Sequence, residues 1–242
     1  MQNDRYAYHS RTLANSMQVR FTVSRGTMAT LQQLREDLVA VMQRMDATGL
    51  NRGTTGNASV RAGDAVLITP TSVPADELTP EAIVELDAEG RPVDPAGRPS
   101  SEWQMHLGIY KRRSDAQALV HCHSRFASTL ACCRREIPSL HYMVGVSGRS
   151  RIPLAPYACF GSLELADRVI ETLDGGFACL MANHGQIAIG NSIRRAFAVA
   201  LEVEEQSAIY WGSLAIGGPT LLSDEQMTEV FAKFKNYGVK SK

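Results

Sequence analysis

The sequence has no long hydrophobic run and no excess of charge of either sign. No apolar stretch approaches the ~20 residues that a membrane-spanning helix needs. The 25 basic and 25 acidic residues cancel, so there is no long-range field to attract nucleic acid or an anionic membrane. We therefore expect neither as a partner, and any anionic substrate has to be held by a local site.

Cysteines are few and are not spaced for a disulfide framework. There are five, an odd number, of which Cys132 and Cys133 are adjacent, and no CxxC motif occurs. Such usage is typical of reduced thiols in a reducing compartment. We therefore expect a cytoplasmic protein.

The first 28 residues differ from the rest of the chain. Residues 1–28 show neither helical nor strand periodicity and lack the apolar core of a secretory signal. We interpret them as a flexible leader, with 29–242 as one domain. A chain of this length buries most of its apolar surface without disulfides.

From Thr30 onward, helical and strand patterns alternate. Apolar spacing predicts helices over 31–48, 101–113, 125–133, 162–174, 192–217 and 224–238. Short alternating or apolar runs predict strands over 58–62, 64–70, 82–87, 118–124, 151–158, 178–182 and 186–190. Several strands are joined by tight turns, which favours antiparallel pairing. The predicted fold is α/β (α+β): a single-domain sandwich with a largely antiparallel central sheet between helix layers.

The strongest local signal for chemistry is a pair of histidines in a strand. His121 and His123 follow the apolar run ALV, and residues two apart on a strand point to the same face. Two imidazoles therefore project together, as metal ligands or as structural histidines. Cys122 points to the opposite face and is expected to pack in the core.

Two further segments complete a possible metal site. His184 lies in a turn between two apolar runs, and with His121 and His123 it makes three histidine ligands, which is the number typical of a catalytic zinc site. Imidazoles suit other divalent transition metals as well. Glu102 at the start of a helix is commonly only a solvated residue, but beside a metal it can be a ligand or a general base.

Eight motifs in order make the chain resemble the class II aldolase/adducin-head family. They are GTTGNASV, LITPTSVP, SSEW, VHCHS, IPSLHYM, APYACFGS, NHG and KFKNYG, and they run from 53 to 238. The resemblance implies that 29–242 is a catalytic domain of this type. It also implies that Zn²⁺ is bound by His121, His123 and His184, with Glu102 as the acid/base and as a ligand of the empty site.

The resemblance implies a substrate pocket as well. Its phosphate-binding residues correspond to Gly56, Asn57, Thr71, Ser72, Ser100 and Ser101. Backbone amides and hydroxyls in such turns can hold a phosphate without a basic patch, although GTTGN alone reads as a plain turn. Tyr142 and Tyr237 correspond to tyrosines near the aldehyde half of the substrate, with Phe160 and Phe234 as wall residues. Tyr237 would come from a neighbouring subunit, because the family forms cyclic homotetramers.

The sequence departs from the family pattern at two positions of one loop. Ser72 replaces a usual glycine, and Ala75 stands where an aromatic residue is common. If the backbone at 72 has a positive φ, the serine costs about 1 kcal/mol. Both positions adjoin the expected phosphate loop and bear on the fit of the substrate.

The implied activity is cleavage of a small phosphorylated sugar by metal-dependent aldol chemistry. The ketose 1-phosphate would be of the L-fuculose 1-phosphate type, and the products are dihydroxyacetone phosphate and an aldehyde. Within the family, 5-deoxyribulose or methylthioribulose 1-phosphate aldolases remain open. So do dehydratases, epimerases and decarboxylases, although Glu102 disfavours epimerases, which usually carry Asp there. A non-catalytic adducin-type binding module is disfavoured by the intact histidines, and a structural zinc site would want four closed ligands.

Overall fold

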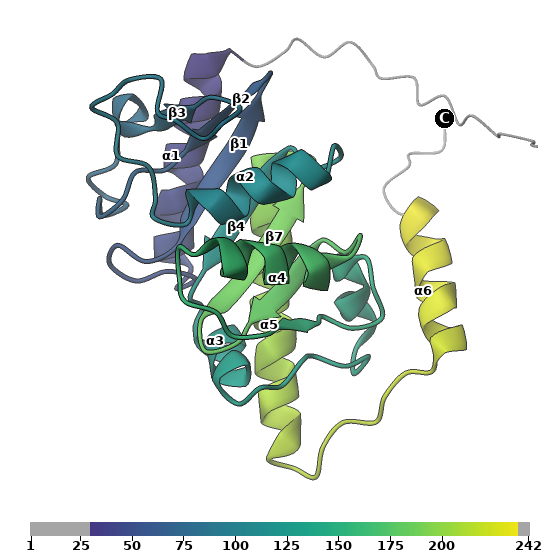
Figure 1. The fold of residues 1–242 in the computed structure, drawn as a ribbon. Coiled ribbons are helices and arrows are strands. Elements are labelled where there is room, and N and C mark those ends of the chain that lie inside the picture. The colour runs from purple at the N-terminus through teal and green to yellow at the C-terminus, as the bar shows by residue number, and fades with distance from the viewer. Residues whose placement is uncertain (1–29, 237–242) are drawn as a thin grey trace, which may run out of the picture.

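The computed structural model of the protein describes residues 30–236. Its centre is one sheet of seven strands in the order β3-β2-β1-β4-β7-β6-β5 (Figure 1). The strands are β1 (Asn57–Ala62), β2 (Ala65–Ile68), β3 (Val84–Leu86), β4 (Ala118–Cys122), β5 (Leu154–Ala155), β6 (Ala178–Met181) and β7 (Gly185–Gly190). All neighbours are antiparallel except β5 and β6. The expected largely antiparallel sheet is confirmed.

Three helices cover one face of the sheet: α1 (Leu31–Ala47), α3 (Arg125–Cys132) and α5 (Ile193–Leu214). Val120 and Ala188 point into this layer, where Leu38 of α1 and Phe197 of α5 are fully buried with them. The layer forms because α1 and α5 repeat apolar residues at three- and four-residue spacing. Both helices begin at a side-chain cap, Thr30 in α1 and Ser192 in α5.

The opposite face is covered by α2 (Trp103–Arg112) and α4 (Leu163–Leu173), which lie in front of the sheet in Figure 1. Leu119 and Ile187 point into this layer, one residue away from Val120 and Ala188 of the other layer. The alternation along β4 and β7 therefore assigns each side chain to a helix layer. The predicted sandwich of helices around the sheet is confirmed.

One predicted strand was wrong in extent. The run 151–158 was expected to be one strand, but only Leu154–Ala155 joins the sheet, as β5 beside β6, while Ile152 forms an isolated bridge with Ile137. Pro153 and Pro156 flank this pair, and a proline has no N–H to give to a ladder. The strand predicted over 118–124 ends at Cys122, so His123 lies just beyond β4.

The C-terminal helix α6 (Asp224–Asn236) follows α5 after an extended connection and lies at the side of the molecule (Figure 1). It packs on the short 3-10 helix η2 (Tyr142–Ser147). Neither η2 nor η1 (Pro80–Ala82) was predicted, because a turn this short has no measurable periodicity. Within residues 30–236, no helix is both long and apolar enough to cross a bilayer.

Candidate metal centre

His121 lies in β4 and His123 just beyond its end, on the face of the sheet that α2 covers. His121 is fully buried, and its Nε2 lies 3.0 Å from Nε2 of His123. Cys122 between them points into the opposite layer and is fully buried there, as predicted. The strand period therefore brings the two imidazoles together.

The turn between β6 and β7 places His184 beside His121 and His123. Asn183 has φ +55°, a left-handed conformation that asparagine adopts more readily than most residues. Gly185 then starts β7 where its backbone passes so close to the carbonyl of Cys122 that a Cβ would clash. The three imidazole rings lie 4.8 Å apart, centroid to centroid.

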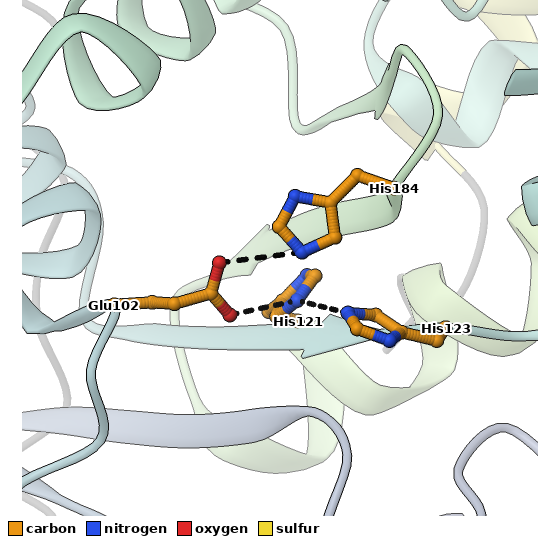
Figure 2. Close-up of side chains that lie close together, drawn as sticks. All are labelled: Glu102, His121, His123 and His184. Carbon is orange, nitrogen blue, oxygen red and sulfur yellow. Dashed lines mark hydrogen bonds and ion pairs between the residues drawn. The ribbon is translucent and has the colours of Figure 1, made fainter. Parts of the chain in front are cut away.

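Glu102 is the residue just before α2, and its carboxylate points toward the histidines (Figure 2). Its Oε2 lies 3.0 Å from Nε2 of His121, and its Oε1 lies 3.3 Å from Nε2 of His184. The side chain is almost fully buried. A carboxylate from a helix start, two histidines from a strand end and one from a turn therefore converge.

The charges of these groups depend on one another. Burial alone would raise the pKa of Glu102, but the neighbouring imidazoles, His121 foremost, hold it below its usual range. Burial would lower the pKa of His121, but Glu102 outweighs it and raises that pKa. Burial and the charge of His121 lower the pKa of His123 and His184. Glu102 and His121 therefore each favour the charged form of the other, whereas His123 and His184 favour their neutral forms.

The donor set fits a divalent cation. Glu102, His121, His123 and His184 each offer one ligand atom, and these atoms all lie within 4.8 Å of one another. Nδ1 of His121 is 2.8 Å from the carbonyl oxygen of Gln186, and because a carbonyl only accepts, Nδ1 carries a proton and Nε2 is the atom free to bind a metal. The buried Oε1 of Glu102 makes no hydrogen bond, which is costly unless a cation satisfies it.

A cavity of about 340 Å³ opens beside this cluster. The expected phosphate residues all line it, together with Glu102, His123 and His184; they are Gly56, Asn57, Thr71, Ser72, Ser100 and Ser101. Within residues 30–236, none of the side chains that line it is a Lys or Arg. Any anion held there would depend on hydroxyls, backbone N–H groups and the metal-ligand cluster.

Backbone hydrogen bonds tie the two loops of the cavity together. The N–H of Ser100 donates to the carbonyl of Thr69 at 3.0 Å, and the N–H of Thr71 donates to the carbonyl of Arg98 at 3.1 Å. Ser72 at the tip of its loop has φ +60°, so this position does have the backbone that favours the usual glycine. Ala75, in contrast, is buried in the layer of α1 and α5 and does not line the cavity.

The expected aromatic residues are not all brought to the cavity. Phe160 lines it and is 68% exposed. Tyr142 lies on η2, half exposed, next to Phe234 of α6 at 6.5 Å between ring centroids, and neither is among the lining residues. Tyr237 lies outside the described residues.

Sequence reasoning missed two features of the site. Tyr157 also lines the cavity, and the sequence carried no signal for it beyond its place in the APYACFGS motif. The side chain of Asn57 donates from Nδ2 to Oε2 of Glu102 at 3.1 Å, and its Oδ1 lies 2.6 Å from Nε2 of His106. His106 had no expected function, and its four-residue spacing from Glu102 was the signal available.

Comparisons with known proteins match this chain to class II aldolases. The family model described as Class II Aldolase and Adducin N-terminal domain matches residues 36–211. The chain is 44% identical over 205 residues to a 5-methylthioribulose-1-phosphate/5-deoxyribulose-1-phosphate aldolase of Rhodospirillum rubrum, which covers 85% of this chain and 92% of that protein. It is 40% identical over 209 residues to the L-fuculose phosphate aldolase of Escherichia coli K12, and that match covers 86% of this chain and 97% of the relative.

The fold comparison agrees. A solved structure described as L-fuculose 1-phosphate aldolase superposes with a TM-score of 0.82 at 36% identity. The match covers 87% of this chain and all of that one. The fold of the chain is therefore shared with a solved protein.

Proposed function

Because the chain belongs to the class II aldolase and adducin N-terminal domain family and is a class II aldolase, we propose that it reversibly cleaves a ketose 1-phosphate to dihydroxyacetone phosphate and an aldehyde. The observation that carries the proposal is the convergence of Glu102, His121, His123 and His184 at the edge of a cavity. Class II aldolases are lyases that depend on a metal, and this cluster can hold one.

His121, His123 and His184 are the proposed ligands of a zinc ion, with Glu102 as an additional ligand when substrate is absent. Three imidazoles with one position left for substrate are typical of catalytic zinc, although other divalent transition metals accept the same ligands. A metal bound there supplies a Lewis acid that polarises the ketose carbonyl. The hydrogen bond from His121 to the Gln186 carbonyl supports this assignment, because it keeps Nε2 available.

The phosphate group is proposed to bind among Gly56, Asn57, Thr71, Ser72, Ser100 and Ser101. Ser100 and Ser101 precede Glu102, the residue before α2, and helix N-termini favour anions through unpaired N–H groups and the helix dipole. Position 56 requires glycine, because its φ is positive and a Cβ would run into the side chain of Asn51. A site without Lys or Arg can thus still hold a phosphate.

Glu102 is the proposed acid/base. In the direction of synthesis it removes a proton from the hydroxymethyl carbon of dihydroxyacetone phosphate, and that carbon then forms a bond to the aldehyde carbon. Tyr142 or Tyr237 gives a proton to the former aldehyde oxygen. In cleavage the carbon–carbon bond breaks and both protons return, so Glu102 protonates the carbon it had deprotonated.

Two classes of ketose 1-phosphate are the candidate substrates. The L-fuculose 1-phosphate type is supported by the relative from Escherichia coli and by the superposed structure. The 5-deoxyribulose and methylthioribulose 1-phosphates are supported by the relative from Rhodospirillum rubrum. The two classes share the phosphate and the carbons next to it, and they differ at the end that would face Tyr157 and Phe160.

We further propose a homotetramer whose sites lie between subunits. Trp211, Leu214 and Ile216 at the end of α5 are exposed, which is typical of a surface that a partner covers. Tyr142 does not line the cavity of its own chain, so a neighbour would have to supply the tyrosines. The five free cysteines support a reducing, cytoplasmic location.

The substitution Glu102→Gln tests the proposed acid/base. It keeps the size of the side chain but cannot accept a proton, so we expect turnover to fall about 10²- to 10⁴-fold while the three histidines retain the metal. Release of dihydroxyacetone phosphate measures turnover, and atomic absorption measures bound metal. Glu164→Gln, on the exposed face of α4, is the matched control and should keep full activity. Near-native turnover of Glu102→Gln would rule out this role.

A further inference from the structure

Buried polar side chains continue from Glu102 into the protein as one hydrogen-bonded series. Asn57 Nδ2 is 3.1 Å from Glu102 Oε2, and Asn57 Oδ1 is 2.6 Å from His106 Nε2. His106 Nδ1 is 2.7 Å from the hydroxyl of Ser59, which is 2.9 Å from the hydroxyl of Tyr110. None of these side chains was assigned a part in proton transfer above except Glu102.

The series is built from two regular periods that face each other. Asn57 and Ser59 are two residues apart on β1 and so point to the same face of the sheet. Glu102, just before α2, and His106 and Tyr110 within it are spaced by four residues, which places them on one side of the helix. All five are at least nine-tenths buried, and only Asn57 and Glu102 line the cavity, so the hydrogen bonds of His106, Ser59 and Tyr110 lie inside the protein.

The direction of every hydrogen bond follows from the carboxylate. An ionised Glu102 only accepts, so the atom of Asn57 that faces it must be the amide nitrogen. Oδ1 of Asn57 then faces His106 and requires a donor, which puts the proton of the imidazole on Nε2. Burial lowers the pKa of His106 to about 3, so the ring is neutral and its Nδ1 accepts from Ser59.

At the far end, the Ser59 hydroxyl donates a hydrogen bond to Nδ1 of His106 and accepts one from the hydroxyl of Tyr110. Burial raises the pKa of Tyr110, which keeps that hydroxyl protonated. Each donor therefore points toward Glu102. Reversing any one of them would leave a buried donor or acceptor unpaired, at a cost of about 1–3 kcal/mol.

We infer that His106 is a positioning residue: by donating from Nε2 to Asn57, it fixes the amide that holds the Glu102 carboxylate in the orientation needed for proton transfer. The inference rests on the proposed function, because it concerns the acid/base of that reaction. It assigns a role to a histidine that touches neither the cavity nor the metal-ligand cluster. Side chains that orient a reacting group in this way commonly affect activity about 10- to 100-fold.

Two amide substitutions separate the two hydrogen bonds of His106. In His106→Gln the side-chain nitrogen stands the same number of bonds from Cβ as Nε2, so it can still donate to Asn57. In His106→Asn the amide reaches only as far as Nδ1, so it can keep the contact to Ser59 but not the one to Asn57. Both variants place an amide in the same buried position.

We expect His106→Gln to keep kcat within about threefold and His106→Asn to lose about tenfold or more. KM for the ketose phosphate and the bound metal should stay unchanged in both. Ile109→Ala, in the same helix and fully buried but outside the series, is the stability control: it should lower the melting temperature and leave kcat intact. Equal losses of kcat in both amide variants, or a loss confined to KM, would overturn the inference.

A second measurement needs no substrate. In protein labelled with ¹⁵N-histidine, the His106 resonances, identified by their disappearance in His106→Gln, should report a neutral ring with the proton on Nε2. A proton on Nδ1, or on both nitrogens at neutral pH, would contradict the hydrogen-bond directions assigned to this series. If wild-type protein cleaves no ketose phosphate, the proposed function fails and takes the catalytic role of His106 with it. Full kcat in His106→Asn overturns this inference alone.

Discussion

His121 and Asn57 each have two polar side-chain atoms, and the hydrogen bond made by one of these atoms determines what the other atom can bind. His121 keeps Nε2 for a metal because Nδ1 donates to a carbonyl, and Asn57 turns its amide nitrogen toward Glu102 because His106 occupies its oxygen. Part of this was predictable: residues 121 and 123 share a face on any strand. The link from Glu102 to His106 was not, because it requires knowing that α2 lies over the beginning of β1.

Ser72 is the residue at which the backbone and the side chain conflict. Its φ is +60°, a conformation in which a Cβ destabilises the folded state by about 1–2 kcal/mol. Glycine removes this strain but loses about 0.5–1 kcal/mol more conformational entropy on folding. We therefore expect Ser72→Gly to raise the free energy of unfolding by about 0.5–1 kcal/mol, measured by urea denaturation. Ser72→Ala removes the same hydroxyl but keeps Cβ, and it should not stabilise the protein. Equal gains in both variants would mean that the hydroxyl, and not the backbone, is responsible.

At the scale of secondary-structure elements, the turn between β6 and β7 places the third histidine. Its strands were predicted from their apolar runs, and the turn from the residues Asn183 to Gly185. Its closeness to β4 could not be predicted, because the neighbours of a strand in a sheet are not encoded in its own pattern. The run 151–158 was predicted too long, because its prolines interrupt the ladder and Ile152 pairs with Ile137 and not with β6.

The substitution Gly185→Ala tests this placement. The added Cβ would meet the carbonyl of Cys122, so the turn has to move, and we expect a loss of about 1–3 kcal/mol in the free energy of unfolding. His184 moves with the turn, so zinc affinity should fall as well, as measured by competition with a chromophoric chelator.

A glycine elsewhere provides the matched control for that change. A Cβ at Gly212 in α5 meets nothing within 4 Å, and alanine is the better helix former by up to about 1 kcal/mol. Gly212→Ala should therefore leave zinc affinity unchanged and stabilise the protein slightly. Native zinc affinity in Gly185→Ala would show that the close approach of β7 to β4 does not determine where His184 lies.

At the scale of the whole molecule, the site exists because the sheet order brings distant segments together. Residues near 56, 71, 101, 122 and 184 line or adjoin one cavity. Periodicity alone predicted the elements and the two helix layers, but it could not predict that these five segments meet. Before the structure, only the family resemblance predicted that these segments form one site, because proteins that share a set of motifs also share a tertiary structure.

The central claim is that this chain is a metal-dependent aldolase acting on a ketose 1-phosphate. The most direct measurement is release of dihydroxyacetone phosphate from L-fuculose, 5-deoxyribulose and methylthioribulose 1-phosphates, each with and without a chelator. We expect release from at least one of them, lost on chelation and restored by added zinc. Fully zinc-loaded protein that releases dihydroxyacetone phosphate from none of the three, or release that persists after complete removal of metal, would contradict it.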